Sequence, residues 1–205
     1  MIVSHVTTHV QKFISFCAKN ADAPYKIKHL VWESAMNSAI LYSCESWLTG
    51  NLKCIEQPYL QTIKTLLGVR PQTCSELVYA ETGEIPVKAK IMARQLSFLK
   101  KIQARDDYEG STLQKAISLA KRHKSPMGNY LVSLESNGQH PDVLGRQDVL
   151  ASIRSSTSTR RSVYLTINPD LTVHKAYKQS LLEHERIAFT RLRLGSHLLR
   201  IETGR

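Results

Sequence analysis

The chain has 205 residues, of which 42% are hydrophobic and 22% are charged, so it can bury a sizeable core and is not a disordered protein. No uncharged apolar run reaches the ~18–20 residues of a membrane helix, and the N-terminus lacks the pattern of a signal peptide. We therefore expect an intracellular protein, in the nucleus or the cytoplasm, with no membrane partner. The formal charge of +11 favours a polyanionic partner, most often nucleic acid.

The first strong helical pattern runs from Ile27 to Leu48, after Pro24, which suits a helix start. Trp32 and Trp47 lie on its apolar stripe, which indicates core packing rather than base stacking.

A second amphipathic helix follows, with apolar side chains spaced by three and four. Its apolar residues are Leu52, Ile55, Tyr59, Ile63 and Leu66. Pro58 should kink or split this helix, and Gly68 should cap it before Pro71.

Thr73 and Glu76 have the spacing of a capping box and predict a short helix that ends at Gly83. A long helix should begin at Pro86 and stop near Arg105. Its predicted apolar stripe comprises Val87, Ile91, Phe98 and Ile102.

Ser111 and Gln114 repeat the capping-box spacing and predict a helix that ends before Pro126. The sequence from 137 to 142 resembles a loop, and a last amphipathic helix should run through Leu192 and close at Gly195. Alternation typical of a strand occurs only over 163–167. The sequence thus predicts an all-α bundle of amphipathic helices with an irregular middle segment.

Cysteine and histidine spacing gives no metal signature. Cys17, Cys44, Cys54 and Cys74 are too far apart to form a close ligand pair, so we interpret them as buried, reduced thiols. His5 and His9 could share a helix face but have no third ligand nearby. We expect no metal ion and no cofactor.

Catalytic motifs are equally scarce. Asp106 and Asp107 form the only adjacent acidic pair, and they follow a predicted helix end rather than a strand, which indicates a solvated loop. The chain also lacks the common phosphate-loop, dinucleotide and serine-nucleophile motifs. We therefore predict that the chain is not an enzyme on its own.

The basic residues carry the functional prediction. Four of them fall within an arc of about 60° on the helix that follows Pro86. These are Lys90, Arg94, Lys101 and Arg105. The last helix adds Arg186, Arg191 and Arg193. All seven are candidate phosphate ligands, because Arg and Lys neutralise phosphates without reading bases. The alternative is that they form a solvated face.

Two parts of the sequence, taken together, are similar to one known family. The first contains 13–28, Ser38–Leu48 (Ser-Ala-Ile-Leu-Tyr-Ser-Cys-Glu-Ser-Trp-Leu), 66–69 and 81–86. The second contains 168–174, Tyr177, 191–197 and 202–205. The first part resembles the region just after the catalytic palm, where the thumb begins, in reverse transcriptases of LINE-type, non-LTR retrotransposons. The second part resembles the linker and the segment immediately before the zinc knuckle of the same family. Ser43 stands where that family usually has glycine.

This resemblance implies a thumb-like helical domain over 1–105, a weakly defined connector over 106–145 and a C-terminal helical segment over 146–205. The catalytic palm would precede Met1 and the zinc knuckle would follow Arg205. The expected function is noncatalytic binding to the phosphates of an RNA–DNA hybrid or duplex, with the palm and zinc-knuckle regions of the parent polyprotein as further partners. The alternatives are a helical protein-interaction module and a relic without a selected function.

Overall fold

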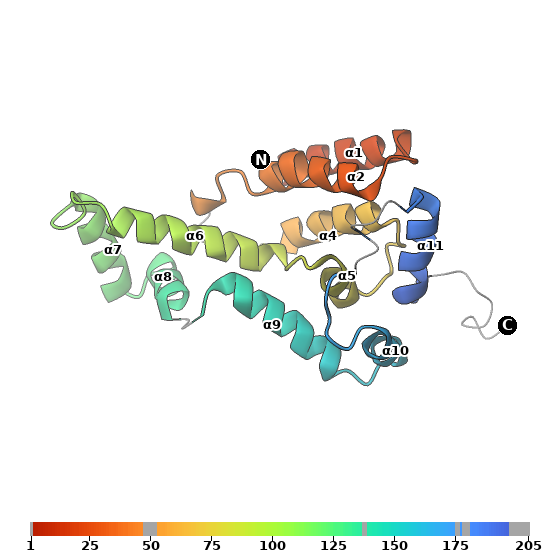
Figure 1. Ribbon diagram of the computed structural model, residues 1–205. Helices are drawn as coiled ribbons and strands as arrows, with labels where there is room; N and C mark the ends of the chain where they lie inside the picture. The colour runs from red at the N-terminus through yellow and green to blue at the C-terminus, as the bar shows by residue number, and fades with distance from the viewer. Residues whose placement is uncertain (1, 47–52, 137–138, 175–176, 178–180, 197–205) are drawn as a thin grey trace.

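The computed structural model describes residues 2–46, 53–136, 139–174, 177 and 181–196, and all regular structure within them is helical (Figure 1). The prediction of an all-α fold is confirmed. The suggested strand at 163–167 is wrong, because these residues belong to helix α10.

The N-terminal region consists of α1 (Ile2–Lys19), α2 (Tyr25–Val31), a π-helix (Trp32–Asn37), α3 (Ser38–Ile40) and a 3-10 turn (Cys44–Ser46). A single helix from Ile27 to Leu48 was predicted, but the chain turns after α3. Ser43 lies in this turn with a φ of 55°, a left-handed conformation that interrupts a right-handed helix. The turn presents residues 41–45 to the side of α6.

The sequence predicts that Pro58 kinks or splits helix α4 (Lys53–Leu67), but the helix is not split, because it continues through Pro58. Its apolar face is fully buried, with Tyr59, Ile63 and Leu67 at 0% exposure, and it packs against α1. This burial holds the helix together across the missing hydrogen bond. Gly68 ends the helix with a φ of 70°, as predicted.

Helix α5 (Ser75–Thr82) begins after Cys74 and ends at Gly83. The predicted capping box is wrong, because Thr73 does not cap the helix. Instead, the hydroxyl groups of Thr73 and Ser196 lie 2.8 Å apart, and this contact ties the α4–α5 connection to the segment that follows α11.

Helix α6 (Val87–Gln103) is the long helix that the sequence predicts. It leads to a hairpin of α7 (Thr112–Arg122) and α8 (Pro126–Ser136) at one end of the molecule (Figure 1). The predicted cap of α7 is confirmed, since the Ser111 hydroxyl accepts a hydrogen bond from the Gln114 amide at 3.1 Å. A Cβ atom on Gly128 would lie 2.0 Å from the Ala120 carbonyl oxygen, so the two helices approach through glycine.

The connector predicted over 106–145 contains α7, α8 and the start of α9 (Pro141–Arg154), and α10 (Thr159–Ile167) follows. The boundary expected between 145 and 146 falls inside α9. Helix α11 (Glu183–Arg193) lies at the opposite end of the molecule from α7 (Figure 1).

The main core unites α1, α4 and α5 with residues from α6, α9 and α10 and with Leu194, which follows α11. Trp32 is 1% exposed in this core, and its indole nitrogen donates to the Thr62 hydroxyl at 2.8 Å. The core assignment of Trp32 is therefore confirmed, whereas Trp47 lies outside the described residues. None of the described helices is long and apolar enough to cross a membrane.

Candidate nucleic-acid interface

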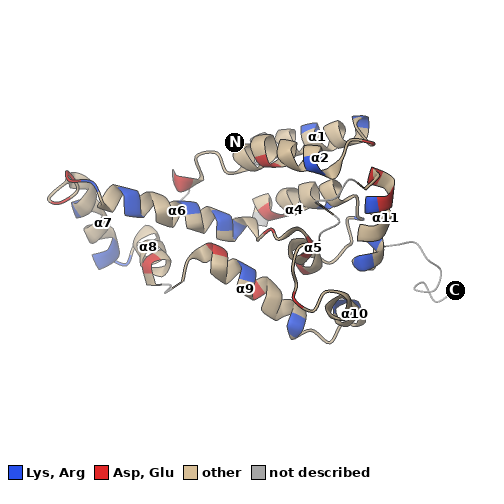
Figure 2. Ribbon diagram, in the orientation of Figure 1, with Lys and Arg blue, Asp and Glu red and all other residues tan. Residues whose placement is uncertain are grey.

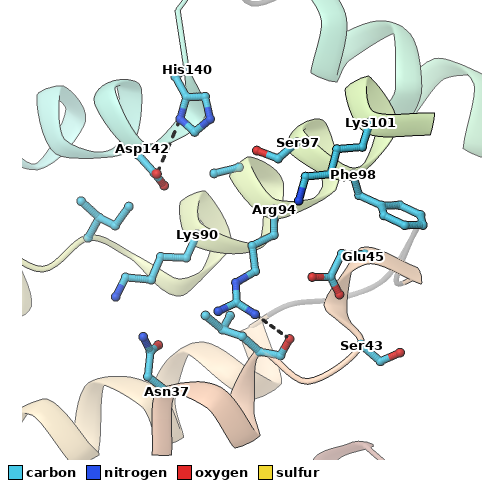
Figure 3. Close-up of a pocket in the computed structure, with 13 residues that line it drawn as sticks. Asn37, Ser43, Glu45, Lys90, Arg94, Ser97, Phe98, Lys101, His140 and Asp142 are labelled. Atoms are coloured by element: carbon cyan, nitrogen blue, oxygen red, sulfur yellow. Dashed lines mark hydrogen bonds and ion pairs between the residues drawn. The ribbon is translucent and has the colours of Figure 1, made fainter. Parts of the chain in front are cut away.

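A groove of about 700 Å³ runs along α6 and contains most of the predicted basic stripe (Figure 3). One wall is α6, with Lys90, Arg94 and Lys101. The opposing walls come from the turn at residues 41–45 and from the start of α9. We refer to this feature as the α6 groove.

Helical geometry places the α6 side chains on one face. Lys90, Arg94, Ser97 and Lys101 are separated by four, three and four residues, which is the spacing of neighbours along one side of an α-helix. The other side of α6 carries Ile91 and Leu99, which are buried. Burial of this apolar side fixes the rotation of α6 and directs the basic stripe into the groove. Figure 2 shows basic segments recurring along the length of α6.

Lys90 is already neutralised within the fold. Its ammonium group forms an ion pair with Glu84 and lies 5.3 Å from the ring centre of Trp32 and 5.5 Å from that of Tyr59. The Tyr59 hydroxyl donates to Glu84 at 3.3 Å, and burial together with Glu84 raises the pKa of Tyr59, so the phenol stays protonated at neutral pH. Lys90 is thus a structural cation at one end of the groove.

Arg94 and Lys101 are the accessible cations of the groove, and both are exposed. An Arg94 Nη1 donates to the Leu41 carbonyl at 3.4 Å, which extends the guanidinium across the groove and leaves other N–H groups for a ligand (Figure 3). Ser97 lies between the two cations along the helix. This arrangement is suited to binding anionic oxygen atoms.

The walls opposite α6 carry the opposite charge. Glu45 lines the groove from the 3-10 turn, and Asp142 lines it from α9, where its Oδ2 lies 3.5 Å from Nδ1 of His140. A phosphate would be repelled by these carboxylates and attracted to α6. The groove therefore has a cationic wall and an acidic wall rather than a uniform charge.

Arg105 lies beyond the groove and interacts with Asp107 instead. Its Nε and Nη2 donate to the two carboxylate oxygens of Asp107, each at 3.0 Å, and both side chains are exposed. Asp106 and Asp107 occupy an exposed turn, as the loop interpretation predicts. The pair leaves Arg105 accessible but partly neutralised.

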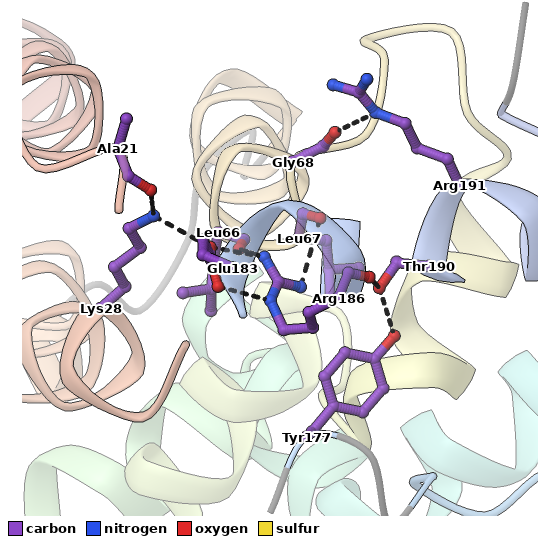
Figure 4. Close-up of polar contacts among 10 residues, drawn as sticks. All are labelled: Ala21, Lys28, Leu66, Leu67, Gly68, Tyr177, Glu183, Arg186, Thr190 and Arg191. Carbon is purple, nitrogen blue, oxygen red and sulfur yellow. Dashed lines mark hydrogen bonds and ion pairs between the residues drawn. The ribbon is translucent and has the colours of Figure 1, made fainter. Parts of the chain in front are cut away.

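Arg186 is part of a buried ion cluster that joins α11 to α2 (Figure 4). It donates to both carboxylate oxygens of Glu183 at 2.8 Å, and Lys28 donates to Oε1 of the same residue at 2.9 Å. It also donates to the carbonyls of Leu66 and Leu67, at 3.3 and 3.4 Å. With 2% exposure, Arg186 cannot reach a phosphate in this fold, so its predicted role is wrong.

The other two arginines of α11 also make contacts within the folded chain. Arg193 is 7% exposed and pairs with the fully buried carboxylate of Glu81. Arg191 is exposed, but its Nε donates to the Gly68 carbonyl at 2.7 Å at the end of α4 (Figure 4). The prediction that Arg193 contacts phosphate is wrong because its guanidinium is enclosed, and Arg191 lies away from the α6 groove.

Several residues that line the groove are not predicted from the sequence, among them Glu45, Phe98, His140 and Asp142. Phe98 was assigned to the apolar stripe of α6 but is 46% exposed and lines the groove, while His140 and Asp142 lie in a stretch interpreted as a loop. The position of Phe98, four residues after Arg94 and three before Lys101, could have placed it on the basic face.

No group of three or more His, Cys, Asp or Glu side chains that could hold a metal ion occurs among the described residues. None of the four cysteines, all of which lie among the described residues, forms a disulfide, but only Cys44 is buried and Cys54 is exposed, so the interpretation of all four as buried is wrong. Burial, reinforced by Glu45, raises the pKa of Cys44 to about 11, so this thiol remains protonated beside the groove at neutral pH. The side chain of His5 lies outside the described residues.

Neither family models, nor curated protein sequences, nor solved structures give a match to this chain in comparisons with known proteins.

Proposed function

We propose that the chain is a noncatalytic nucleic-acid-binding segment that uses the α6 groove to hold a phosphate backbone. The observation that carries this proposal is the position of Arg94 and Lys101, two exposed cations on one wall of a single groove, in a chain of net charge +11. Arginine can donate two hydrogen bonds to one phosphate, and lysine adds a compact positive charge.

The resemblance to LINE-type reverse transcriptases supports the same proposal. In that setting the chain is the thumb and connector of an intracellular polyprotein, and its partner is an RNA–DNA hybrid or duplex. Ser43 adds a structural argument, because its φ of 55° favours glycine, the residue that the family usually has there. The palm and zinc-knuckle regions of such a polyprotein would be its neighbours.

On this proposal the chain does not extend a primer by itself, because Asp106 and Asp107 form an exposed turn in which Asp107 holds Arg105. Primer-extension assays with Mg²⁺ and with Mn²⁺ test this expectation. Extension that disappears on Asp106→Asn and Asp107→Asn substitution would make the pair catalytic and contradict the proposal.

A salt titration of binding tests the phosphate contacts directly. The Arg94→Gln/Lys101→Gln double variant removes two cations from the groove and keeps good helix formers. Its log–log salt slope should fall by about 1.4–1.8 relative to the unmodified chain, since each lost contact lowers the slope by about 0.7–0.9. Binding should weaken equally for all base sequences, because phosphates carry no sequence information.

The matched control is Lys88→Gln/Lys100→Gln, which removes the same charge from exposed positions of α6 that do not line the α6 groove. We expect this control to retain most of the affinity. Equal losses in the two double variants would show that only the net charge matters and would contradict a groove-based contact.

A protein-interaction module is the second candidate, because several large apolar side chains are exposed. Leu30, Tyr42 and Leu182 are 60%, 74% and 61% exposed. Such a module would bind its partner through apolar contacts and would show little dependence on salt. The salt titration therefore separates the two candidates.

A further inference from the structure

We infer that the α6 groove accepts an unpaired strand of nucleic acid and that Phe98 is a stacking platform for one of its bases. This inference rests on the proposed function and extends it, because phosphate contacts alone do not distinguish a single strand from a duplex.

The first support is the exposure of Phe98. Phe98 is 46% exposed, although Ile91, Leu96 and Leu99 of the same helix are 0%, 5% and 6% exposed. Leaving an aromatic side chain half in water forgoes the favourable free energy of its burial. An exposed aromatic residue in a groove is thus available to a ligand.

The second support is the position of Phe98 between the two cations. It follows Arg94 by four residues and precedes Lys101 by three, so all three residues are neighbours on one face of α6. Figure 3 shows the Phe98 ring and the Lys101 side chain toward the same end of the groove. An aromatic ring beside cationic side chains is the combination that single-strand-binding proteins use, with bases on the rings and phosphates on the cations.

The third support is the shape of the site. The bases of a duplex are stacked in its interior and present only their edges in the grooves, so a protein ring reaches the face of a paired base only by unstacking a base step, which costs free energy. The α6 groove, at about 700 Å³, has the size of a site for a small organic ligand, of the order of 300–1,000 Å³. An unpaired nucleotide fits such a site, whereas a duplex would lie across its rim.

The groove also continues in the direction of the helix N-terminus. A second cavity of about 440 Å³ shares Ile85, Lys90 and Asp142 with the α6 groove and extends to Arg146. Arg146 is anchored there by a hydrogen bond of 3.3 Å from its Nη1 to the Gly83 carbonyl. The two cavities form a path along α6 that several successive nucleotides of one strand can follow.

The test compares three probes of equal strand length, about 12 nucleotides, which is within the range of known single-strand sites. They are a single strand with bases, a fully abasic phosphodiester strand and a duplex, each measured by fluorescence anisotropy at low salt. For Phe98→Ala, binding of the base-bearing strand should weaken roughly 5- to 150-fold, the loss typical of one stacked base. Binding of the abasic strand and of the duplex should not change.

Two further variants control for fold and surface chemistry. Phe98→Trp keeps an aromatic stacking surface and should therefore bind the base-bearing strand about as tightly as the unmodified chain does. Leu192→Ala removes an exposed apolar side chain, 58% exposed, from α11 at the far end of the molecule and should leave all three affinities unchanged.

The outcomes separate the inference from the function on which it rests. If the unmodified chain binds none of the probes at low salt, the proposed function fails. If it binds them but Phe98→Ala weakens none, or weakens all three alike, the phosphate contacts stand and the stacking role of Phe98 is overturned. A loss confined to the base-bearing strand and reversed by Phe98→Trp establishes the stacking role.

Discussion

Arg193 donates two hydrogen bonds to Glu81 across 112 positions of sequence, from Nε to Oε1 at 2.7 Å and from Nη2 to Oε2 at 3.1 Å. The carboxylate also accepts hydrogen bonds from the hydroxyls of Tyr164 and Tyr177, at 2.6 and 2.8 Å. Burial raises the pKa of both tyrosines, so they remain donors at neutral pH. A single carboxylate of α5 therefore connects α10, α11 and the segment between them.

Replacing this carboxylate should be costly. We expect Glu81→Gln to lower the free energy of unfolding by about 3–5 kcal/mol, because it leaves the enclosed guanidinium of Arg193 without its counter-ion. Urea unfolding monitored by circular dichroism measures the change. Glu185→Gln, on an exposed position of α11, is the control and should stay within about 0.5 kcal/mol of the unmodified chain. Equal stability of the two variants would contradict the role of Glu81.

The Glu183 cluster should make stability depend on pH. Burial alone would raise the pKa of Glu183, but hydrogen bonds and charge from Arg186 and Lys28 outweigh it and hold the pKa below its ordinary value of 4.5. The contribution is thus complete above about pH 4.5 and is lost as pH falls through the lower pKa of the folded state.

The measurement is the free energy of unfolding between about pH 7 and pH 3. Glu183→Gln should unfold more easily at neutral pH and show a shallower loss in acid than the unmodified chain. If both lose stability with the same slope below about pH 4.5, other carboxylates account for the acid sensitivity.

Ser43 offers a test of backbone strain. Its φ of 55° disfavours any residue with a Cβ atom, so Ser43→Gly should be more stable than Ser43→Ala by about 1 kcal/mol. Both changes remove the same hydroxyl, and their difference isolates the backbone. Thermal unfolding of the two variants measures it, and a more stable alanine variant would be inconsistent with the left-handed turn.

Lys90 should matter for stability and little for binding. Lys90→Gln removes the counter-ion of Glu84 and the cation from the rings of Trp32 and Tyr59, and should cost about 1–3 kcal/mol of folding free energy. The exposed Lys88→Gln is the matched control and should cost little. Nucleic-acid affinity should change far less than in the Arg94→Gln/Lys101→Gln variant, and a comparable loss would restore Lys90 as a phosphate ligand.

Periodicity predicted helices whose apolar faces reach the main core, such as α4 and α6. It did not predict α9, where Val149 and Ile153 are buried but the preceding Gly-Arg-Gln-Asp stretch at 145–148 interrupts the apolar pattern. The break after α3 depends on the left-handed conformation of Ser43. The conformational preference of serine does not predict this conformation.

The candidate site was predictable where one helix supplies it. The spacing of Arg94 and Lys101 placed both on one face of α6, and the structure brings that face to a groove. The buried role of Arg186 was not predictable. Its partner Glu183 is only three residues away, but Lys28, which pairs with the same carboxylate, and the carbonyls of Leu66 and Leu67 are distant in sequence and meet Arg186 only in the tertiary fold. Charge identity alone cannot distinguish a surface cation from one held in a buried ion pair.

The separate small core of the α7–α8 hairpin has a consequence for dynamics. Leu99, Ile117 and Leu131 form its buried cluster, apart from the main core. So few buried contacts favour local opening at a lower free energy than global unfolding. Amide hydrogen exchange should therefore be faster in α7 and α8 than in α4. Because Leu99 lies between Phe98 and Lys101 in sequence, each opening of the hairpin would loosen the end of α6 that carries them, and on the proposed function it would speed the release of a bound strand.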